Sequence, residues 1–277
     1  MPSSARRDNA VKKTAKHQPD GSLSSDRQFV TALARGLDIL KAFQPGENLL
    51  ANRDIAARTN LPRPTVSRLT HTLTKLGYLV YEPAQEKYRL GSAVLSLGYA
   101  VIANMELHNI ARPYLQEIAD YTRAACALGD VHGLQMIYVE SYRGKTAPFT
   151  LGLGVGSSIP IATTAMGRAY LAALPEEARE AIFTQLAEQH GRDWGQLRQR
   201  IDVALEDYAR TGFVLSVADW VPEINSVGVP IVLEKSNTVM AINCGGAASL
   251  LSVDFLMQQV GPRLVAAKHE IEAASRR

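Results

Sequence analysis

Cationic, hydroxyl and imidazole side chains recur at helical spacing between residues 63 and 75. At about 100° per residue they share one face of a helix, with Thr65 and Thr72 on its flanks. The face consists of Pro64, Ser67, Arg68, His71 and Lys75, and Arg63 opens the helix. Such groups bind phosphates and base edges, which is the chemistry of a helix in the major groove of DNA. An ordinary basic surface helix is the alternative.

An apolar stripe on the opposite side of this helix and a tight turn before it would keep the cationic face exposed to solvent. The stripe consists of Val66, Leu69, Leu73 and Leu76. The segment Asn60-Leu61-Pro62 ends a preceding short helix, because the residue before a proline is biased out of the helical region. Residues 52–77 therefore predict a helix-turn-helix whose second helix carries the cationic face.

A basic hairpin is expected directly after the helix-turn-helix. Residues 77–81 and 87–91 predict strands, joined by a turn at 82–86. The inward positions are predicted to be Tyr78, Val80, Tyr88 and Leu90. Lys87 and Arg89 then lie on the other face, where they can contact phosphate or the minor groove. A helix-turn-helix followed by a basic hairpin indicates a winged helix.

A further helix is expected ahead of these elements, over residues 29–43. Its apolar stripe consists of Val30, Leu33, Leu37, Leu40 and Phe43. Arg35 lies off that stripe, where it either contacts phosphate or only keeps the helix soluble. The winged-helix domain is therefore assigned to residues 27–91. Residues 1–26 are polar and aperiodic, which predicts a disordered basic arm that either follows the DNA or makes no defined contact.

The charge of the chain is divided unevenly between its two parts. Residues 1–104 hold 15 Lys and Arg against 8 Asp and Glu, a net of +7. Residues 105–277 hold 15 against 19, a net of −4. The basic part is the one with the winged-helix pattern, as a polyanion-binding module requires. With 277 residues, the chain is long enough for two globular domains.

The composition gives no sign of a membrane or a disulfide framework. No apolar run approaches the roughly 18 residues of a membrane span, and the polar N-terminus lacks the apolar core of a signal peptide. We therefore expect a cytoplasmic protein without a membrane partner. Cys126 and Cys244 each lie in an apolar run and are expected to be core residues.

Residues 92–107 predict a linker helix with an apolar stripe. The stripe consists of Val94, Leu97, Val101 and Ile102. The apolar stripe of a helix between two domains must be buried against another surface, and a second copy of the chain can provide that surface. We expect this region to carry much of the interface of a homodimer. A two-fold dimer would match a palindromic operator.

Residues 108–277 predict an α+β domain with a mainly antiparallel sheet. Apolar, β-rich runs occupy 124–130, 135–142, 147–151, 213–218, 225–233 and 238–244. Helices are expected over about 164–173, 175–190, 194–211 and 252–274. A Gly-rich loop at 152–156 fits neither a P-loop nor a dinucleotide fingerprint, and is expected to border a cavity.

Thr163, Thr164 and Ala165 stand at the expected start of the helix over 164–173. Free backbone N–H groups and two hydroxyls there can bind a carboxylate, although a threonine at that position can equally be a simple cap. Side chains from the sheet are expected to face this helix start. They are Met136, Tyr138, Val217, Asp219, Trp220, Ser226, Asn243 and Cys244. A largely apolar pocket with a few hydroxyl and amide groups suits a small organic acid, aromatic acids included.

Enzyme chemistry finds little support in the sequence. The motifs HExxH, GxSxG and Cys-x-x-Cys do not occur, and Cys126, His132 and Cys244 lack the spacing of a known zinc site. We therefore expect no catalytic residue, metal or cofactor. One alternative is a hydrolase built on Ser216 or Ser226 and fused to a DNA-binding module. Another is a DNA-binding protein that needs no ligand.

Several segments together resemble the IclR family of transcriptional regulators. They are ALARGLDILKAF (32–43), DIAARTNLPRPTVSRLTHTLTKLGYL (54–79), YRLG (88–91), PIATTAMGRAYLA (160–172) and GFVLSVADWVPEINSVGVPI (212–231). The resemblance covers essentially the whole chain after residue 28. It implies a winged helix, a linker helix and an effector-binding domain of GAF-like fold. It also implies dimers or tetramers that bind operator DNA and respond to a small metabolite.

The chain departs from the family at the turn, where family members often have a glycine and this chain has Asn60. Asparagine tolerates left-handed backbone, so we expect the turn to form. Residues 219–220 and 243–245 occupy positions that vary within the family, so ligand identity does not carry over. The chain is thus predicted to be a ligand-responsive regulator of a catabolic operon, acting as repressor, activator or both.

Overall fold

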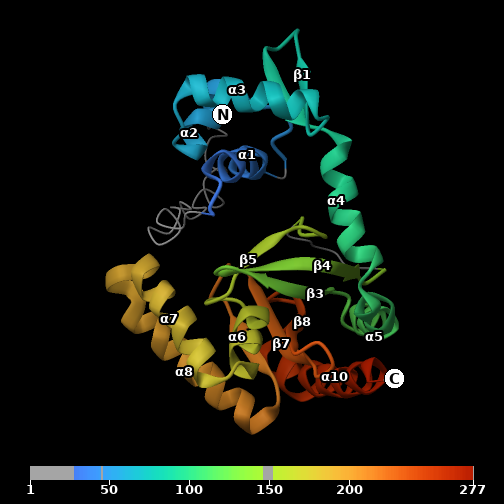
Figure 1. The fold of residues 1–277 in the computed structure, drawn as a ribbon. Helices are drawn as coiled ribbons and strands as arrows, with labels where there is room; N and C mark the ends of the chain where they lie inside the picture. The colour runs from blue at the N-terminus through green and yellow to red at the C-terminus, as the bar shows by residue number, and fades with distance from the viewer. Residues whose placement is uncertain (1–27, 45, 146–151, 277) are drawn as a thin grey trace, which may run out of the picture. The chain divides into compact units, whose positions relative to one another are not determined.

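The computed structural model describes residues 28–44, 46–145 and 152–276. They form two compact units, one that ends at Leu97 and one that begins at Gly98. Figure 1 shows the helices and strands of both units. The boundary falls inside helix α4 (Ser92–Ala103), and α5 (Glu106–Thr122) belongs to the C-terminal unit. The predicted arm over 1–26 and the predicted strand over 147–151 lie outside the described residues.

Three helices and a hairpin form the N-terminal unit, as the sequence predicts. They are α1 (Thr31–Lys41), α2 (Asn52–Thr59), α3 (Arg63–Lys75), β1 (Leu79–Glu82) and β2 (Lys87–Leu90). Helices of this length are marginal on their own, so their shared apolar core must stabilise them. The core consists of Ile39, Ala42, Leu50, Ile55, Val66 and Leu79.

Asn60 makes the tight turn between α2 and α3. It ends α2 in the left-handed region, with φ 55° and ψ 30°. The turn expected despite the departure from glycine is therefore present, because asparagine accepts this conformation more readily than most residues with a Cβ.

The predicted apolar stripe of α1 is partly wrong. Val30, Leu33 and Leu37 are exposed, whereas Ile39 is fully buried. The helix packs on the core through Ile39 and Leu40, a face adjacent to the one predicted. The N-terminal unit thus leaves three apolar side chains of one α1 stripe uncovered.

The predicted faces of the hairpin are also wrong in β1. Leu79 is the buried residue of this strand and pairs with Leu90, while Val80 pairs with Arg89. Val80 therefore shares the face of Arg89 instead of pointing inward. The strand starts at Leu79 rather than Gly77. Its inward position, Leu79, is one residue away from those predicted, and an offset of one residue exchanges the two faces of a strand.

The C-terminal unit contains one antiparallel sheet of six strands, which confirms the predicted α+β class. The strands are β3 (Ala125–His132), β4 (Gln135–Arg143), β5 (Ser158–Pro160), β6 (Val214–Val217), β7 (Ile224–Leu233) and β8 (Thr238–Ala247). Their order in the sheet is β5-β4-β3-β8-β7-β6, and every neighbouring pair is antiparallel.

Helices cover both faces of this sheet (Figure 1). One face packs on α5 and on α10 (Gly261–Ser275), and its core includes Leu115, Ile242 and Leu264. The other face packs on α6 (Ala165–Ala173), with α7 (Glu176–His190) and α8 (Trp194–Thr211) in the same core. The last predicted helix is divided into α9 (Val253–Phe255), a π-helical turn (Leu256–Val260) and α10.

A β-bulge in β4 shifts the alternation of its side chains. Leu128 of β3 pairs with Glu140 and Gly129 pairs with Tyr138, so Val139 is the extra residue. Two residues of the bulged strand oppose one on its partner, which breaks the period of two. As a result Tyr138 and Ser141 both face α6, although they are three residues apart, whereas Tyr142 packs in the core beside α5.

Helix α6 lies very close to the sheet because the strand beneath it carries a glycine. A Cβ at Gly228 of β7 would lie 2.7 Å from the carbonyl oxygen of Ala165. A side chain there would push the helix away. This close approach fixes the N-terminus of α6 over β7.

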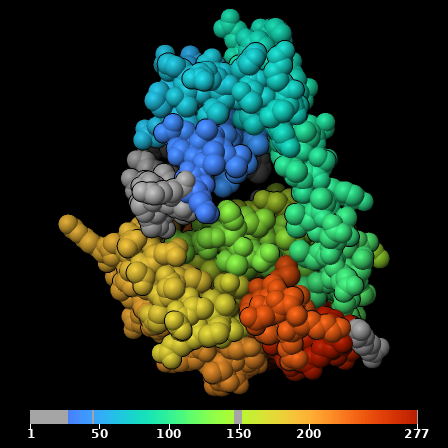
Figure 2. All heavy atoms as spheres, viewed as in Figure 1, coloured from blue at the N-terminus to red at the C-terminus, as the bar shows by residue number. Residues whose placement is uncertain are grey.

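Helix α4 is apolar and uncovered. None of its residues is buried, and in Figure 2 its side chains form part of the visible surface. The exposed fractions of Leu95 and Tyr99 are 75% and 70%, which is high for large apolar side chains. Large uncovered apolar surfaces of this kind mark interaction sites.

Candidate DNA-binding surface and ligand cavity

The outward face of α3 is exposed and cationic. The predicted residues Arg63, Pro64, Ser67, Arg68, His71 and Lys75 are all exposed, and Thr65 is half-buried. The helix contains no acidic residue, and among the described residues no ion pair involves Arg63, Arg68 or Lys75. An approaching phosphate would therefore meet positive charge that no carboxylate compensates.

Thr70 holds the back of α3 against α2. Its side chain is fully buried, and its hydroxyl lies 2.9 Å from the carbonyl oxygen of Val66 and 3.3 Å from Oδ1 of Asn52. The second contact crosses from one helix of the helix-turn-helix to the other. The apolar stripe read from the sequence omits Thr70 because threonine is polar.

The predicted wing residues lie on one face of the hairpin. Lys87 is half-buried and Arg89 is exposed. Arg89 Nε donates to Glu82 Oε1 over 2.8 Å, in a pair whose side chains are 49% and 37% exposed. Exposed pairs of this kind contribute only about 0–1 kcal/mol, so a phosphate can compete for the guanidinium. Arg35 is exposed on α1.

The C-terminal unit contains a cavity of about 50 Å³ between the sheet and the start of α6. Its lining consists of Ala125, Ala127, Tyr138, Ser141, Arg143, Leu153, Ile159, Thr164, Trp220, Ile224, Ser226, Asn243, Gly245 and Gly246. Since a water needs about 10–15 Å³, the cavity has room for a few waters. Five predicted residues come together there: Tyr138, Thr164, Trp220, Ser226 and Asn243.

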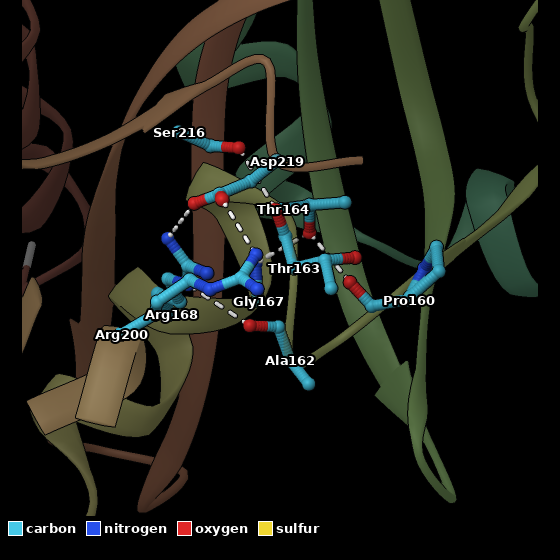
Figure 3. Close-up of polar contacts among 9 residues, drawn as sticks. All are labelled: Pro160, Ala162, Thr163, Thr164, Gly167, Arg168, Arg200, Ser216 and Asp219. Atoms are coloured by element: carbon cyan, nitrogen blue, oxygen red, sulfur yellow. Dashed lines mark hydrogen bonds and ion pairs between the residues drawn. The ribbon is translucent and has the colours of Figure 1, made fainter. Parts of the chain in front are cut away.

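Thr164 is the N-cap of α6 at the edge of the cavity. Its Oγ1 accepts a hydrogen bond from the Gly167 backbone N–H over 3.2 Å and donates to the Pro160 carbonyl oxygen over 2.7 Å (Figure 3). Both bonds lie within the chain, so the single proton of this hydroxyl is already used. The capping role expected as one alternative is therefore present.

Tyr138 and Asn243 form a buried polar pair on the cavity wall. Nδ2 of Asn243 donates to the Tyr138 hydroxyl over 3.4 Å, and Oδ1 of Asn243 is buried without a partner among the described residues. Burial raises the pKa of Tyr138 to about 12, so the phenol keeps its proton at neutral pH. The pair therefore presents one unmatched acceptor and one O–H donor.

The other predicted ligand residues lie outside this cavity. Met136 and Ala165 are buried in the core beside it, and Val217 is exposed. The carbonyl oxygen of Thr163 accepts a hydrogen bond from the Ser216 hydroxyl. The Oγ1 of Thr163 is buried without a partner in the described part of the chain. Cys244 was expected beside Asn243, but consecutive strand residues face opposite sides of a sheet.

Cys244 instead packs against Cys126 in the core beside α5 and α10. The two residues are direct cross-strand partners on β8 and β3. Both side chains are fully buried, and burial raises the pKa of the Cys126 thiol. This thiol is therefore a core group, as predicted, and not a reactive thiolate.

Asp219 forms ion pairs with two arginines and does not line the cavity. Its Oδ2 lies 2.7 Å from Nη1 of Arg168 and its Oδ1 lies 3.1 Å from Nη1 of Arg200. Figure 3 shows both ion pairs as dashed lines. Arg168 Nε also donates to the Ala162 carbonyl oxygen over 2.9 Å. Burial lowers the pKa of the Arg168 guanidinium, and the nearby Asp219 charge opposes that shift. Asp219 thus ties α6 to the segment that carries Trp220.

Sequence reasoning missed Arg143, the one charged residue among the described residues that line the cavity. Arg143 and Ser141 come from β4, and strict alternation from Tyr138 would place both on the other face. The bulge at Val139 reverses that assignment. Arg143 Nη2 donates to the Leu153 carbonyl oxygen over 3.0 Å, at an exposed position.

The described residues carry no group of three or more His, Cys, Asp or Glu that could hold a metal ion. Within the same residues, no helix is long and apolar enough to cross a bilayer. The polar side-chain groups of the described lining are one guanidinium, hydroxyls, an amide and the indole N–H of Trp220, which suit recognition of a ligand by hydrogen bonds.

Comparisons with known proteins support the description of both the N-terminal and the C-terminal unit. Residues 32–83 match the IclR helix-turn-helix domain, and residues 99–273 match the bacterial transcriptional regulator IclR C-terminal domain. The HTH-type transcriptional regulator TsaQ1/TsaQ2 of Comamonas testosteroni is 32% identical over 259 residues, which are 93% of this chain and 93% of that protein.

Solved structures show the same fold. The crystal structure of an IclR family transcriptional regulator from Brucella abortus has 42% identity and a TM-score of 0.82, and the match covers 90% of this chain and 94% of that one. An IclR homolog from Microbacterium hydrocarbonoxydans shares the fold at 20% identity and a TM-score of 0.71, over 89% and 99% of the two chains. The chain therefore belongs to the IclR family of DNA-binding transcriptional regulators.

Proposed function

We propose that this regulator controls a catabolic operon and that a small organic acid, bound in the cavity of the C-terminal unit, sets its affinity for operator DNA. The ligand part of this proposal rests on Oδ1 of Asn243, which is buried in the cavity wall and has no partner among the residues that the structure describes. A buried acceptor without a partner is costly, so the site favours a ligand that supplies a donor.

The DNA-binding part is supported by the uncompensated cations of α3. In this proposal α3 enters the major groove, where Arg68 reads a base edge and the remaining cations position the helix on phosphates. The residues assigned to DNA contact are Arg35, Arg63, Pro64, Thr65, Ser67, Arg68, His71, Lys75, Lys87 and Arg89. Their exposure, with Thr65 and Lys87 half-buried, is compatible with that role.

An aromatic acid is a candidate ligand. The Microbacterium homolog was crystallised in complex with 4-hydroxybenzoate, and the cavity here includes the rings of Tyr138 and Trp220. A benzene ring needs a cavity of about 150 Å³, whereas this one has about 50 Å³. Binding of a ring therefore requires side chains of the lining to move.

That requirement connects the ligand to regulation. If the cavity exists in a narrow and a widened arrangement, a ligand that binds only the widened one shifts the population toward it. Asp219 links α6 to the segment carrying Trp220, so movement of that segment would be transmitted to the helix. A coupling of about 1–3 kcal/mol, or 5–150-fold in operator affinity, is typical.

Self-association completes the proposal. The uncovered apolar residues of α4 and α1 support a homodimer or a tetramer, in which two winged helices engage a palindromic operator. Such a regulator acts on DNA in the cytoplasm and needs no cofactor or metal.

A thermal-shift panel of aromatic and aliphatic acids, followed by measurement of operator affinity with and without each stabilising compound, tests this function. A ligand that binds only the folded state raises Tm. We expect at least one acid to raise Tm without being consumed and to change operator affinity. Turnover of the compound would favour an enzyme, and unchanged operator affinity would rule out regulation by it.

A further inference from the structure

The cavity has one charged side and one uncharged side. Cross-strand register places Arg143, Ala125, Gly245 and Ser226 in one row across β4, β3, β8 and β7. Neighbouring strands lie about 4.8 Å apart, so the Cα atoms of Arg143 and Ser226 are separated by roughly 14 Å. The floor between them carries nothing larger than a methyl group, which leaves a trough between the two ends.

Arg143 makes one end of the trough cationic. It is the only charged residue among those described that line the cavity. One N–H of its guanidinium bonds to the Leu153 carbonyl oxygen, and the side chain is otherwise exposed at the cavity edge. The planar fork of an arginine binds a carboxylate through two parallel hydrogen bonds. Arg168, by contrast, is already paired with Asp219.

Asn243 and Tyr138 make a different site at the uncharged side. Oδ1 of Asn243 needs a donor, and the Tyr138 O–H, which accepts from Asn243 Nδ2, can still donate its own proton. A hydroxyl both donates and accepts, so it matches this pair. A carboxylate would place its oxygens against the Asn243 oxygen, which disfavours binding in the reverse direction.

We infer that the cavity binds a hydroxy acid in one direction only, with its carboxylate on Arg143 and its hydroxyl on Asn243 and Tyr138. The inference rests on the proposed ligand-sensing function and adds to it the direction of binding and the residues that set specificity. Arg143 selects acids over neutral compounds. Asn243 selects hydroxylated acids over those without the hydroxyl.

Binding of four probes to the full-length protein, measured by calorimetry, tests the inference without any variant. The probes are 4-hydroxybenzoate, benzoate, 4-methoxybenzoate and 4-hydroxybenzamide. We expect 4-hydroxybenzoate to bind about tenfold tighter than the uncharged amide and about fivefold tighter than benzoate. The methoxy compound cannot donate to Asn243, so it should also bind less tightly. Equal affinity for the methoxy and hydroxy acids would overturn the hydroxyl assignment.

Two variants test the charged side and the uncharged side of the cavity. Arg143→Gln should abolish the preference for acid over amide and keep the preference for the hydroxyl. Asn243→Ala should abolish the preference for the hydroxyl and keep the preference for acid over amide. Asn243→Ser is a second variant in case the first does not fold. Arg179→Gln is the matched control for Arg143, because Arg179 also donates to a backbone carbonyl, that of Leu174, over 3.3 Å but lies outside the cavity. It should change none of the four affinities.

The outcomes separate this inference from the function on which it rests. If the acids bind but each variant changes all four affinities alike, the assigned direction is wrong and ligand sensing stands. If wild-type protein binds none of the four probes while another acid in the panel raises Tm and alters operator affinity, the hydroxy-acid inference fails alone. If no acid binds at all, both proposals fail.

Discussion

Asp219 holds the buried guanidinium of Arg168 at a distance of 2.7 Å between Oδ2 and Nη1. Arg168 comes from α6, and Asp219 comes from the segment between β6 and β7 that also carries Trp220. The Arg168 side chain is 3% exposed, whereas that of Arg200, the second partner of Asp219, is 51% exposed. The two ion pairs should therefore differ strongly in their effect on stability.

Replacement of Asp219 tests that difference. Asp219→Ala should lower the free energy of unfolding by about 3–5 kcal/mol, because it leaves the Arg168 charge buried without a counter-charge. Arg200→Gln removes only the exposed pair and should cost less than about 1 kcal/mol. Urea unfolding of the full-length variants measures both values. Equal losses in the two variants would show that burial of Arg168 does not matter.

Arg68 is predicted to read a base. Arg68→Ala should weaken operator binding by about 1–3 kcal/mol and relax specificity at one base pair, because a guanidinium can pair with a guanine edge. Fluorescence anisotropy with a set of single-base operator variants gives the measurement. A uniform loss across all variants would instead assign Arg68 to phosphate. Arg179→Ala, in the C-terminal unit, is the control and should bind like wild type.

Asn60 should tolerate glycine but not a β-branched residue. Left-handed backbone costs a residue with a Cβ roughly 1–2 kcal/mol, so Asn60→Val should destabilise the N-terminal unit by about that amount. Asn60→Gly should be neutral to within about 0.5 kcal/mol, because glycine adopts this conformation freely. Thermal unfolding followed by circular dichroism compares them. A stable Asn60→Val variant would mean that the turn can adopt another conformation.

The uncovered face of α4 is predicted to associate with another copy of the chain. Leu95→Glu combined with Tyr99→Glu should shift the protein toward monomer, since charges in an apolar interface disfavour its formation. Analytical ultracentrifugation measures the change. Ser96→Glu adds one glutamate at an exposed polar position of α4 and should leave the sedimentation unchanged. If the wild-type protein is monomeric at micromolar concentration, α4 does not mediate self-association.

Tyr138 should make stability fall at alkaline pH. Burial raises the pKa of Tyr138 from 10.0 to about 12. Above pH 10 the unfolded state releases a proton that the folded state keeps. The stabilising effect is therefore complete below pH 10 and is lost as pH rises to 12, by up to about 3 kcal/mol. Unfolding free energies between pH 8 and 12 should fall less steeply for Tyr138→Phe. The exposed Tyr99→Phe is the control and should keep the wild-type slope.

The sequence predicted the winged helix, the α+β class and the starts of most elements, because these depend on local patterns. The apolar stripe of α3 that contains Val66 and the turn at Asn60 are examples, because the helical period and the position of the proline determine them locally. The errors in α1 and β1 have a different origin. Which apolar stripe of α1 faces the core depends on how α2 and α3 pack, which no local pattern specifies.

The candidate cavity was predictable only in part for the same reason. Tyr138, Ser226 and Asn243 could be placed from alternation within single strands. Arg143 could not, because its direction depends on a bulge that shows only in the pairing of β4 with β3. Cys244 was misplaced by ignoring alternation next to Asn243, an error that the sequence itself could have corrected.

The extra residue at Val139 has an evolutionary consequence. A deletion of one codon there would remove the bulge, and Glu140 would then follow Tyr138 in regular alternation. Ser141 and Arg143 would keep their partners on β3, so the guest compound would still meet the same chemical groups. Relatives with this architecture can therefore gain or lose one residue at this point without a change in the metabolite they recognise.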